Sequence, residues 1–448
     1  MYLKRKIDKI LDDWLANPSS KPALIVGIRQ CGKTESIIEL GKRNNKLIIN
    51  INFWTNPEFC NDFKDSLEVD LIISNISLRM PNIDINSKDV LIFFDEIQEC
   101  PRARLALKNF AIDGRYKVIA SGSYLGINGY CVGDFTPVPT GYEEVIQMKT
   151  LDFEEFLWAN NYNEQHINEL KKYFDQKKEI PTNIHNIYNN IFNDYVCIGG
   201  FPDVVKEFVN TKNLSKAFKK LESLKFDIQS DFGRRKGKDN KPLFKTSEVA
   251  RIQNCFDLIP TFLSKENKRF VTSKIQTGSS AEKSDAIEYL RQAHIVNKVF
   301  NVEVPSLPLQ GFKISSQFKL FPEDIGIVIS MYGHDTLLAI HNGDLGQGKG
   351  AIFESIVFDS LSKAGFDCFY FAKETGLEID FVISYNGSCY LVEAKSKNGN
   401  TKSAKTVMKN PDHYGPTKLI KFGEYNIGES GDTITLPHYL AFMLGKWI

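Results

Sequence analysis

The chain has 448 residues, more than one ordinary hydrophobic core holds, so we expect roughly two to four domains. Its 42% hydrophobic and 25% charged residues are typical of a globular protein, and a formal net charge of +1 predicts no general attraction to polyanions. Eight scattered cysteines indicate neither a zinc site nor a disulfide framework, and no signal peptide or membrane span is evident, so we expect a cytoplasmic protein without a membrane partner.

The first motif follows an amphipathic helix predicted over residues 2–16. The stretch ALIVGIRQCGKTE at 23–35 indicates a strand, a loop and a helix, and its loop matches the phosphate-binding pattern G-x-x-x-x-G-K-[ST]. Glycines let the loop turn tightly so that its N–H groups face a phosphate at the helix N-terminus. Lys33 would contact the β- and γ-phosphates, and the Thr34 hydroxyl would hold Mg²⁺. The expected nucleotide-binding residues are Gly27, Ile28, Arg29, Gln30, Cys31, Gly32, Lys33, Thr34 and Glu35.

A second motif ends a buried strand. After a strand at 47–53, the run VLIFF at 90–94 is followed by Asp95 and Glu96, the arrangement of a Walker B strand. Asp95 would hold Mg²⁺, and Glu96 would orient and deprotonate the attacking water. The next strand, KVIASGS at 117–123, ends in Ser121 and Ser123, which either sense the γ-phosphate or form an ordinary turn.

The middle of the chain is predicted to be helical. A strand at 141–151 completes a parallel α/β sheet, and helices follow over 152–232. The basic stretch GRRKGKDNK at 233–241 reads as a solvated linker, with Arg234 or Arg235 as the alternative, an arginine finger. Residues 246–302 predict three helices followed by a β extension, and the first helix is expected over 247–263. This arrangement resembles a winged helix. Acidic residues on its second helix favour packing over DNA contact.

The C-terminal part carries a third set of charged residues. A helix at 352–364 contains Glu354, a strand contains Asp380, and the strand SCYLVEAK ends in Glu393 and Lys395. A helix, an acid and then E-x-K is the order of the PD-(D/E)xK nuclease core, in which carboxylates hold a divalent ion and a lysine activates water. Strand-end charges at a sheet edge are the alternative, and the order of residues leaves open whether the domain cuts DNA.

Taken together, these motifs resemble the prokaryotic AAA-class ATPases whose P-loop domain is fused to a C-terminal restriction-endonuclease-like domain of unknown function. The resemblance rests on GIRQCGKT, LIFFDEIQ, ASGS, LDFEEF, GGFP, DIQSDFGRR, EIDFVI and LVEAKS. It implies ATP and Mg²⁺ at Lys33, Thr34 and Asp95, with Glu96 as the catalytic carboxylate. It also implies a winged-helix middle segment and a nuclease-like site at Glu354, Asp380, Glu393 and Lys395.

We therefore expect an α/β protein with a P-loop core at 1–150, a helical lid and linker at 151–240, a winged-helix-like segment at 241–305 and a nuclease-like domain at 306–448. The expected function is an ATP-driven switch that acts on DNA or a protein partner. The alternatives are an ATP-regulated, metal-dependent DNA nuclease and a non-cutting, nucleotide-gated binding module. A homo-oligomer is compatible with each of them.

Overall fold

The computed structural model describes residues 1–85, 89–122, 141–233, 244–265, 268–342, 349–395, 401–415 and 417–447. The chain divides into two compact units. The first comprises Met1–Thr150, Gly233–Thr246 and Gln292–His294, and the second comprises Leu151–Phe232, Ser247–Arg291 and Ile295–Ile448. Each unit contains its own sheet, so each buries its own core.

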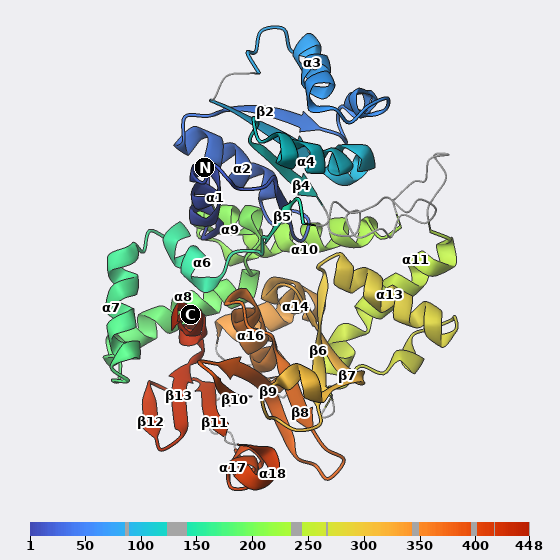
Figure 1. Cartoon of the computed structure of the whole chain (residues 1–448). Helices are drawn as coiled ribbons and strands as arrows, with labels where there is room; N and C mark the ends of the chain where they lie inside the picture. Colours follow the sequence, from blue (N-terminus) through green and yellow to red (C-terminus); the bar gives the residue numbers. More distant parts are fainter. Residues whose placement is uncertain are drawn as a thin grey trace. The chain divides into compact units, whose positions relative to one another are not determined.

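The first unit is built on a parallel five-stranded sheet, coloured blue to teal (Figure 1). The strand order is β2-β3-β4-β1-β5. The strands are β1 (Ala23–Val26), β2 (Leu47–Asn52), β3 (Val90–Asp95), β4 (Val118–Gly122) and β5 (Glu144–Gln147). Strand β4 lies between β1, which leads into the predicted phosphate loop, and β3, which ends at Asp95. The carboxyl ends of these three strands therefore meet at one edge of the sheet, and the predicted parallel α/β sheet is confirmed.

Helices cover both faces of this sheet. They are α1 (Ile7–Ala16), α2 (Lys33–Arg43), α3 (Val69–Arg79) and α4 (Pro101–Asp113), together with 3₁₀ turns at Pro57–Phe63 and Ile97–Glu99. One face packs against α3 and α4 through a dry core in which Phe53, Phe63, Phe94 and Phe110 meet edge-on or tilted. Helix α2 contacts the sheet without joining that core, so it covers the opposite face. Strand β3 is buried along its whole length, as its apolar sequence predicts.

The second unit begins with helices and continues into a mixed sheet. Its helices are α6 (Phe153–Ala159), α7 (Glu164–Asp175), α8 (Thr182–Ile198), α9 (Pro202–Thr211), α10 (Leu214–Ser230), α11 (Thr246–Asp257), α12 (Ile259–Leu263), α13 (Ser280–Gln292), α14 (Ile325–Tyr332), α15 (His334–His341), α16 (Lys349–Lys363), α17 (Lys402–Met408) and α18 (Pro411–Tyr414). Shorter 3₁₀ segments lie at Thr272–Lys274, Leu309–Phe312 and His438–Trp447. The helical prediction for residues 152–232 is confirmed by α6 to α10.

The second sheet has eight strands in the order β12-β13-β11-β10-β9-β8-β6-β7, coloured yellow to red (Figure 1). They are β6 (Val296–Val302), β7 (Lys313–Pro322), β8 (Phe369–Ala372), β9 (Glu378–Tyr385), β10 (Ser388–Ala394), β11 (Thr417–Gly423), β12 (Gly428–Ser430) and β13 (Thr433–Pro437). Strand β6 pairs with β7 in antiparallel fashion and with β8 in parallel. The expected boundary at 305/306 therefore falls between two strands of one sheet.

One predicted helix is interrupted. Residues 247–263 were expected to form a single helix, but the structure has α11 and α12 with a break at Leu258. The cause is Pro260 in the first turn of α12, because proline lacks an N–H donor and its ring clashes with the carbonyl four residues earlier. The prediction of one continuous helix is wrong for this reason.

A fully buried ion cluster holds the second unit together. The Lys363 ammonium on α16 lies 2.9 Å from carboxylate oxygens of both Asp324 and Asp359. It also donates to the Leu151 carbonyl oxygen, and the Tyr195 hydroxyl donates to Asp359 at 3.0 Å. A buried charge is tolerated when it is paired and hydrogen-bonded, so this cluster ties the start of the unit to α8 and α16.

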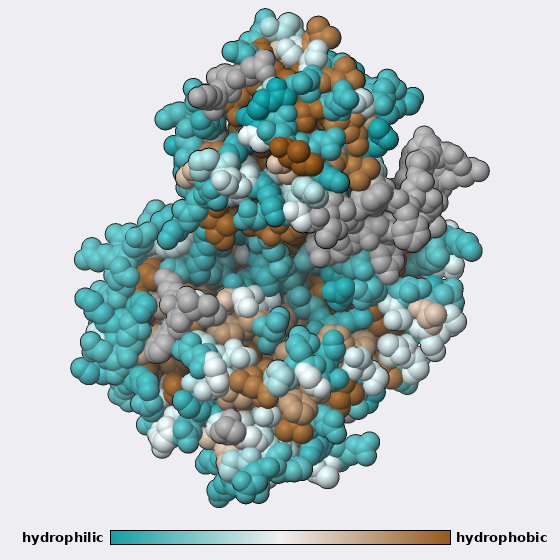
Figure 2. All heavy atoms as spheres, viewed as in Figure 1, coloured by the Kyte–Doolittle hydropathy of each residue, from teal (hydrophilic) through white to brown (hydrophobic). Residues whose placement is uncertain are grey.

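The described helices include none with the length and hydrophobicity needed to cross a bilayer. Figure 2 shows hydrophilic and hydrophobic residues interspersed over the viewed face.

The ion cluster predicts a large effect of one substitution on stability. Lys363→Met leaves two carboxylates buried without their cation, so the free energy of unfolding should fall by about 3–5 kcal/mol. Urea denaturation followed by circular dichroism measures it. The matched control is Lys171→Met, which removes a more exposed pair with Asp175 on α7 and should cost about 0.5 kcal/mol or less. Equal losses in the two variants would contradict the assigned role of the cluster.

Candidate functional site

The first candidate site is the loop between β1 and α2. Gly27 has a φ of 159°, and a Cβ added there would lie 2.0 Å from the carbonyl oxygen of Met148. Gly32 has a φ of 99°, a left-handed conformation that other residues rarely adopt. The Lys33 ammonium folds back over the loop and donates to the carbonyl oxygens of Gly27 and Ile28 at 3.0 Å each. The close approach to Met148 at position 27 and the left-handed backbone at position 32 thus explain why the loop has glycine at both positions.

The N-terminal segment stabilises this loop through hydrogen bonds from Arg5. The Arg5 guanidinium is buried and donates to the Cys31 carbonyl at 2.9 Å and to the Lys149 carbonyl at 2.6 Å. Cys31 is itself fully buried, and its thiol lies 3.6 Å from the Met148 carbonyl oxygen. Sequence analysis did not identify Arg5, because nothing in its local pattern links it to a loop 26 residues later.

The Asp95 carboxylate is the meeting point of the site. It is 3% exposed and lies at the end of β3. The Thr34 hydroxyl donates to it at 3.2–3.3 Å, the Asn52 amide at 2.9 Å, and the Ser121 hydroxyl also donates to it. The structure therefore brings Thr34, Asp95 and Ser121 together as expected. Asn52 joins them from the end of β2, a position at which the sequence allows a place at the phosphate site but favours a turn.

Glu96 lies beside this cluster in a special backbone conformation. Its φ of 53° is left-handed, and its carboxylate accepts a hydrogen bond from the Gln98 amide. A non-glycine residue in this region is held there by its surroundings, which occurs often at functional sites. Glu96 is half-buried whereas Asp95 is buried, so the two adjacent acids have different environments.

The other residues that the sequence predicts for this site either are exposed or lie outside the described residues. The side chains of Arg29, Gln30 and Glu35 are exposed on the loop and the first turn of α2. Three further candidates, Ser123, Arg234 and Arg235, lie outside the described residues.

The loop fits a bound nucleotide on structural grounds. The first N–H groups of α2 have no partner within the helix, and the close approach at Gly27 leaves no room for a side chain. Thr34 and Asp95 present the oxygen ligands that Mg²⁺ prefers.

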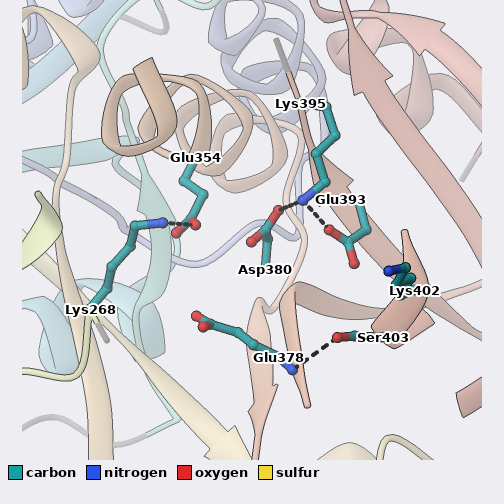
Figure 3. Close-up of a pocket in the computed structure, with 8 residues that line it drawn as sticks. All are labelled: Lys268, Glu354, Glu378, Asp380, Glu393, Lys395, Lys402 and Ser403. Atoms are coloured by element: carbon teal, nitrogen blue, oxygen red, sulfur yellow. Dashed lines mark hydrogen bonds and ion pairs between the residues drawn. The ribbon is translucent and has the colours of Figure 1, made fainter. Parts of the chain in front are cut away.

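The second candidate site is a cavity of about 270 Å³ in the second unit. Phe381 on β9 pairs with Val392 on β10, which places Asp380 next to Glu393. Figure 3 shows these two carboxylates, Glu354 from α16 and Lys395 pointing toward a common space. The structure thus brings the four expected residues together. The remaining lining residues are Lys268, Glu378, Lys402 and Ser403. Of these, only Lys402 is suggested by the sequence, as one of several lysines that follow the E-x-K motif.

The carboxylates of this cavity form salt bridges with lysine ammonium groups. The Lys395 ammonium lies 2.5 Å from Glu393 and 3.4 Å from Asp380, and Lys268 forms a salt bridge with Glu354. Fully buried Lys319 lies 3.1 Å from Glu378 and 3.5 Å from the second oxygen of Glu354. In the part of the chain that the structure describes, no three His, Cys, Asp or Glu side chains are arranged to hold a metal ion.

The pKa values of these acids reflect burial and mutual repulsion. Burial, with the charge of Asp380, raises the pKa of Glu393 to about 8. Burial raises the pKa of Glu354 to about 7 against the opposing charge of Lys319. Burial would also raise the pKa of Asp380, but Lys395, Lys319 and Lys268 together lower it below its ordinary value. One carboxylate is thus kept ionised while its neighbours hold protons more tightly, a division typical of functional sites.

His438 contacts the backbone of Lys395 at one side of this cavity. Its ring stacks on Phe353, with ring centroids 4.9 Å apart, and one ring nitrogen lies 3.0 Å from the carbonyl oxygen of Lys395. Its other ring nitrogen is buried without a hydrogen-bond partner. Burial lowers the pKa of His438 to about 4, so the ring is neutral in the folded protein.

Three family models match the sequence. Residues 19–157 match an AAA domain, residues 189–338 match a domain of unknown function (DUF8612), and residues 349–439 match another domain of unknown function (DUF4143). Residues 19–157 are therefore an AAA-class P-loop domain, and the part of the prediction that names this class is confirmed. No functionally curated protein has a significantly similar sequence.

Several solved structures are distantly similar. The Walker-type ATPase PABY2304 of Pyrococcus abyssi is 14% identical, with 74% of this chain and 96% of that chain covered and a TM-score of 0.42. AMPPCP-bound DnaA from Aquifex aeolicus is 14% identical over 63% and 86% of the two chains, with a TM-score of 0.27. The Aeropyrum pernix ORC1 protein in complex with DNA is 12% identical over 76% and 94%, with a TM-score of 0.25. Likenesses this weak do not establish a shared activity.

The buried histidine predicts a specific pH dependence. Below about pH 6.5 the unfolded chain protonates His438, whereas the folded protein resists protonation until about pH 4. Stability is therefore lost as the pH falls through this window, by up to about 3 kcal/mol.

Urea denaturation of wild type and His438→Gln between pH 7.5 and 4 tests this dependence. The difference in unfolding free energy between the two proteins should shrink or reverse toward pH 4, since the glutamine variant lacks the titrating group. A difference that stays constant with pH would show that His438 does not titrate as its burial requires.

Proposed function

We propose that this chain binds and hydrolyses ATP with Mg²⁺ at its AAA-class domain and uses turnover as a conformational switch. One observation carries the proposal. The Asp95 carboxylate at the end of β3 collects hydroxyl donors from Thr34 on α2 and Ser121 on β4, directly beside the phosphate loop. That convergence supports the proposal, because a carboxylate that could bind Mg²⁺, the phosphate loop and a candidate sensor all lie at one edge of the sheet.

The roles follow from the chemistry of each group. Loop N–H groups and Lys33 would bind the β- and γ-phosphates, and Lys33 would leave its carbonyl partners to do so. Thr34 and Asp95 would hold Mg²⁺, which neutralises phosphate charge when bound. Glu96 would accept a proton from the attacking water, while Ser121 would report on the γ-phosphate through Asp95.

The remaining parts of the chain complete the proposal. Residues 151–240 would act as a helical lid and linker, 241–305 as a winged-helix-like segment and 306–448 as a nuclease-like domain. The switch would act on DNA or on a protein partner. Arg234 or Arg235 would serve as an arginine finger, either at the nucleotide of its own chain or, in a homo-oligomer, at that of a neighbouring chain.

Turnover measurements on two variants test the ATPase. Lys33→Ala removes the charge at the phosphates, so ATP turnover should fall about 100-fold or more. Glu96→Gln keeps the shape but not the base, so it should bind ATP normally and lose turnover by a similar factor. Phosphate release and fluorescent-nucleotide binding measure the two properties separately.

The matched control is Lys42→Ala, which removes an exposed lysine from the same helix α2. It should leave turnover unchanged. Full turnover in Lys33→Ala would rule out this site as the ATPase centre.

A second candidate function is metal-dependent DNA cleavage regulated by ATP. The observation that favours it is the shared cavity of Glu354, Asp380, Glu393 and Lys395 (Figure 3). Asp380 and Glu393 would hold a divalent ion, and Lys395 would orient or activate water. Lys402, Lys405 and Lys409 on or next to α17 would contact phosphates beside the cavity.

A plasmid nicking assay with Mg²⁺ or Mn²⁺ tests this candidate. Wild-type protein should nick DNA, Asp380→Ala and Lys395→Ala should abolish nicking, and Glu96→Gln should change only its dependence on ATP. Lys171→Ala, on α7 and outside the lining of the cavity, is the control and should cut normally. DNA left intact under all conditions while ATP turns over would instead support a switch whose C-terminal domain only binds.

A further inference from the structure

The C-terminal cavity is completed by residues from the preceding segment of the chain. Lys268 lies between α12 and the turn at Thr272–Lys274, and Lys319 lies on β7. Both belong to the region that matches DUF8612, whereas the acids of the cavity belong to the DUF4143 match. Because β6 and β7 extend the same sheet as β8 to β13, the two regions form one structural unit around the cavity.

The three lysines that contact the acids differ in how firmly they are held. Lys319 contacts two carboxylates and lies over the Tyr370 ring, and Lys395 contacts two carboxylates. Within the described residues, Lys268 forms a salt bridge with a single carboxylate, that of Glu354. It also lies in a stretch without helix or strand, so its side chain can leave with the least loss of structure.

Glu354 has an oxygen atom available for another ligand. Its side chain is 2% exposed and points into the cavity, yet the Oε2 atom is buried without a hydrogen-bond partner. The nearby Lys319 ammonium lies 3.5 Å from that atom, beyond a strong charge-assisted hydrogen bond. A buried carboxylate oxygen without a hydrogen-bond donor is costly, and oxygen is the ligand that Mg²⁺ and Mn²⁺ prefer, so the chemistry of these carboxylates suits a divalent cation. The acids of the described residues are not arranged around such an ion, so binding requires a lysine partner to move.

We propose that Lys268 is a built-in competitor for this cation, an ammonium group that neutralises Glu354 until a divalent ion displaces it. The inference rests on the second candidate function, because it takes the same carboxylates as metal ligands. The Lys268 ammonium pairs with Oε1 of Glu354, the other oxygen of the same carboxylate. A metal ion bound at Oε2 would lie close to that ammonium group, and their charges repel. Once displaced, the Lys268 ammonium stays at the cavity rim, where it faces an incoming phosphate group.

Metal titration of the full chain without nucleotide tests the proposal, with Mn²⁺ as the probe and calorimetry as the readout. Lys268→Met keeps an apolar stem but removes the competing charge. An adjacent charge changes the proton affinity of a carboxyl group by about one to three pKa units, so Mn²⁺ affinity should rise by about tenfold or more. Lys268→Arg keeps the charge and should stay near wild type, as should the distant control Lys171→Met.

A double-variant cycle locates the effect. Glu354→Gln should weaken Mn²⁺ binding, and Lys268→Met should have little further effect in that background, because the two residues act through one carboxylate. Lys268→Gln and thermal unfolding of every variant guard against a folding defect.

The outcomes separate the inference from the function beneath it. Unchanged or weaker Mn²⁺ binding in Lys268→Met and Lys268→Gln would overturn the competitor role while leaving the metal site in place. Absence of binding in wild type and in both Lys268 variants would overturn the inference and the nuclease candidate together. Binding that is insensitive to Asp380→Asn would place the ion elsewhere and would also overturn both.

Discussion

The structure of the first unit depends on one buried carboxylate. Removing Asp95 from water is unfavourable unless donors replace the lost hydration, and they come from Thr34, Asn52 and Ser121. These residues end or begin different elements, namely α2, β2 and β4, so satisfying one charge fixes three elements at the same edge of the sheet. The same contacts place the carboxylate beside the phosphate loop, and a structural requirement thereby builds the proposed catalytic centre.

The second unit solves the same electrostatic problem with lysines. Lys363 is enclosed by two aspartates in the buried cluster, and that arrangement is complete, with each charge paired and hydrogen-bonded. The cavity around Asp380 is also paired with lysines, but one oxygen of Glu354 lacks a donor. The difference separates a cluster that serves stability from a cavity with the capacity to exchange a ligand.

Features that are local in the sequence were predictable. The loop at 27–34, the acids after β3 and the E-x-K end of β10 follow from short patterns attached to apolar strands, and the structure places each at a strand end. Contacts between distant segments left no such pattern. The contacts of Arg5 with the phosphate loop, of His438 with Lys395 and of Lys268 with Glu354 are recognised only once the chain is folded. Likewise, the pairing of β6 with β8 could not be predicted from the sequence, because an apolar strand does not specify which strand lies next to it.

The central claim is that Asp95 receives the metal ion of a bound nucleotide. Electron paramagnetic resonance of Mn²⁺ with a non-hydrolysable ATP analogue tests it most directly, in wild type and in Asp95→Asn. The account predicts a nucleotide-dependent Mn²⁺ signal in wild type whose affinity falls by about tenfold or more in the variant, since a charged ligand is lost. An undiminished nucleotide-dependent signal in Asp95→Asn would contradict it.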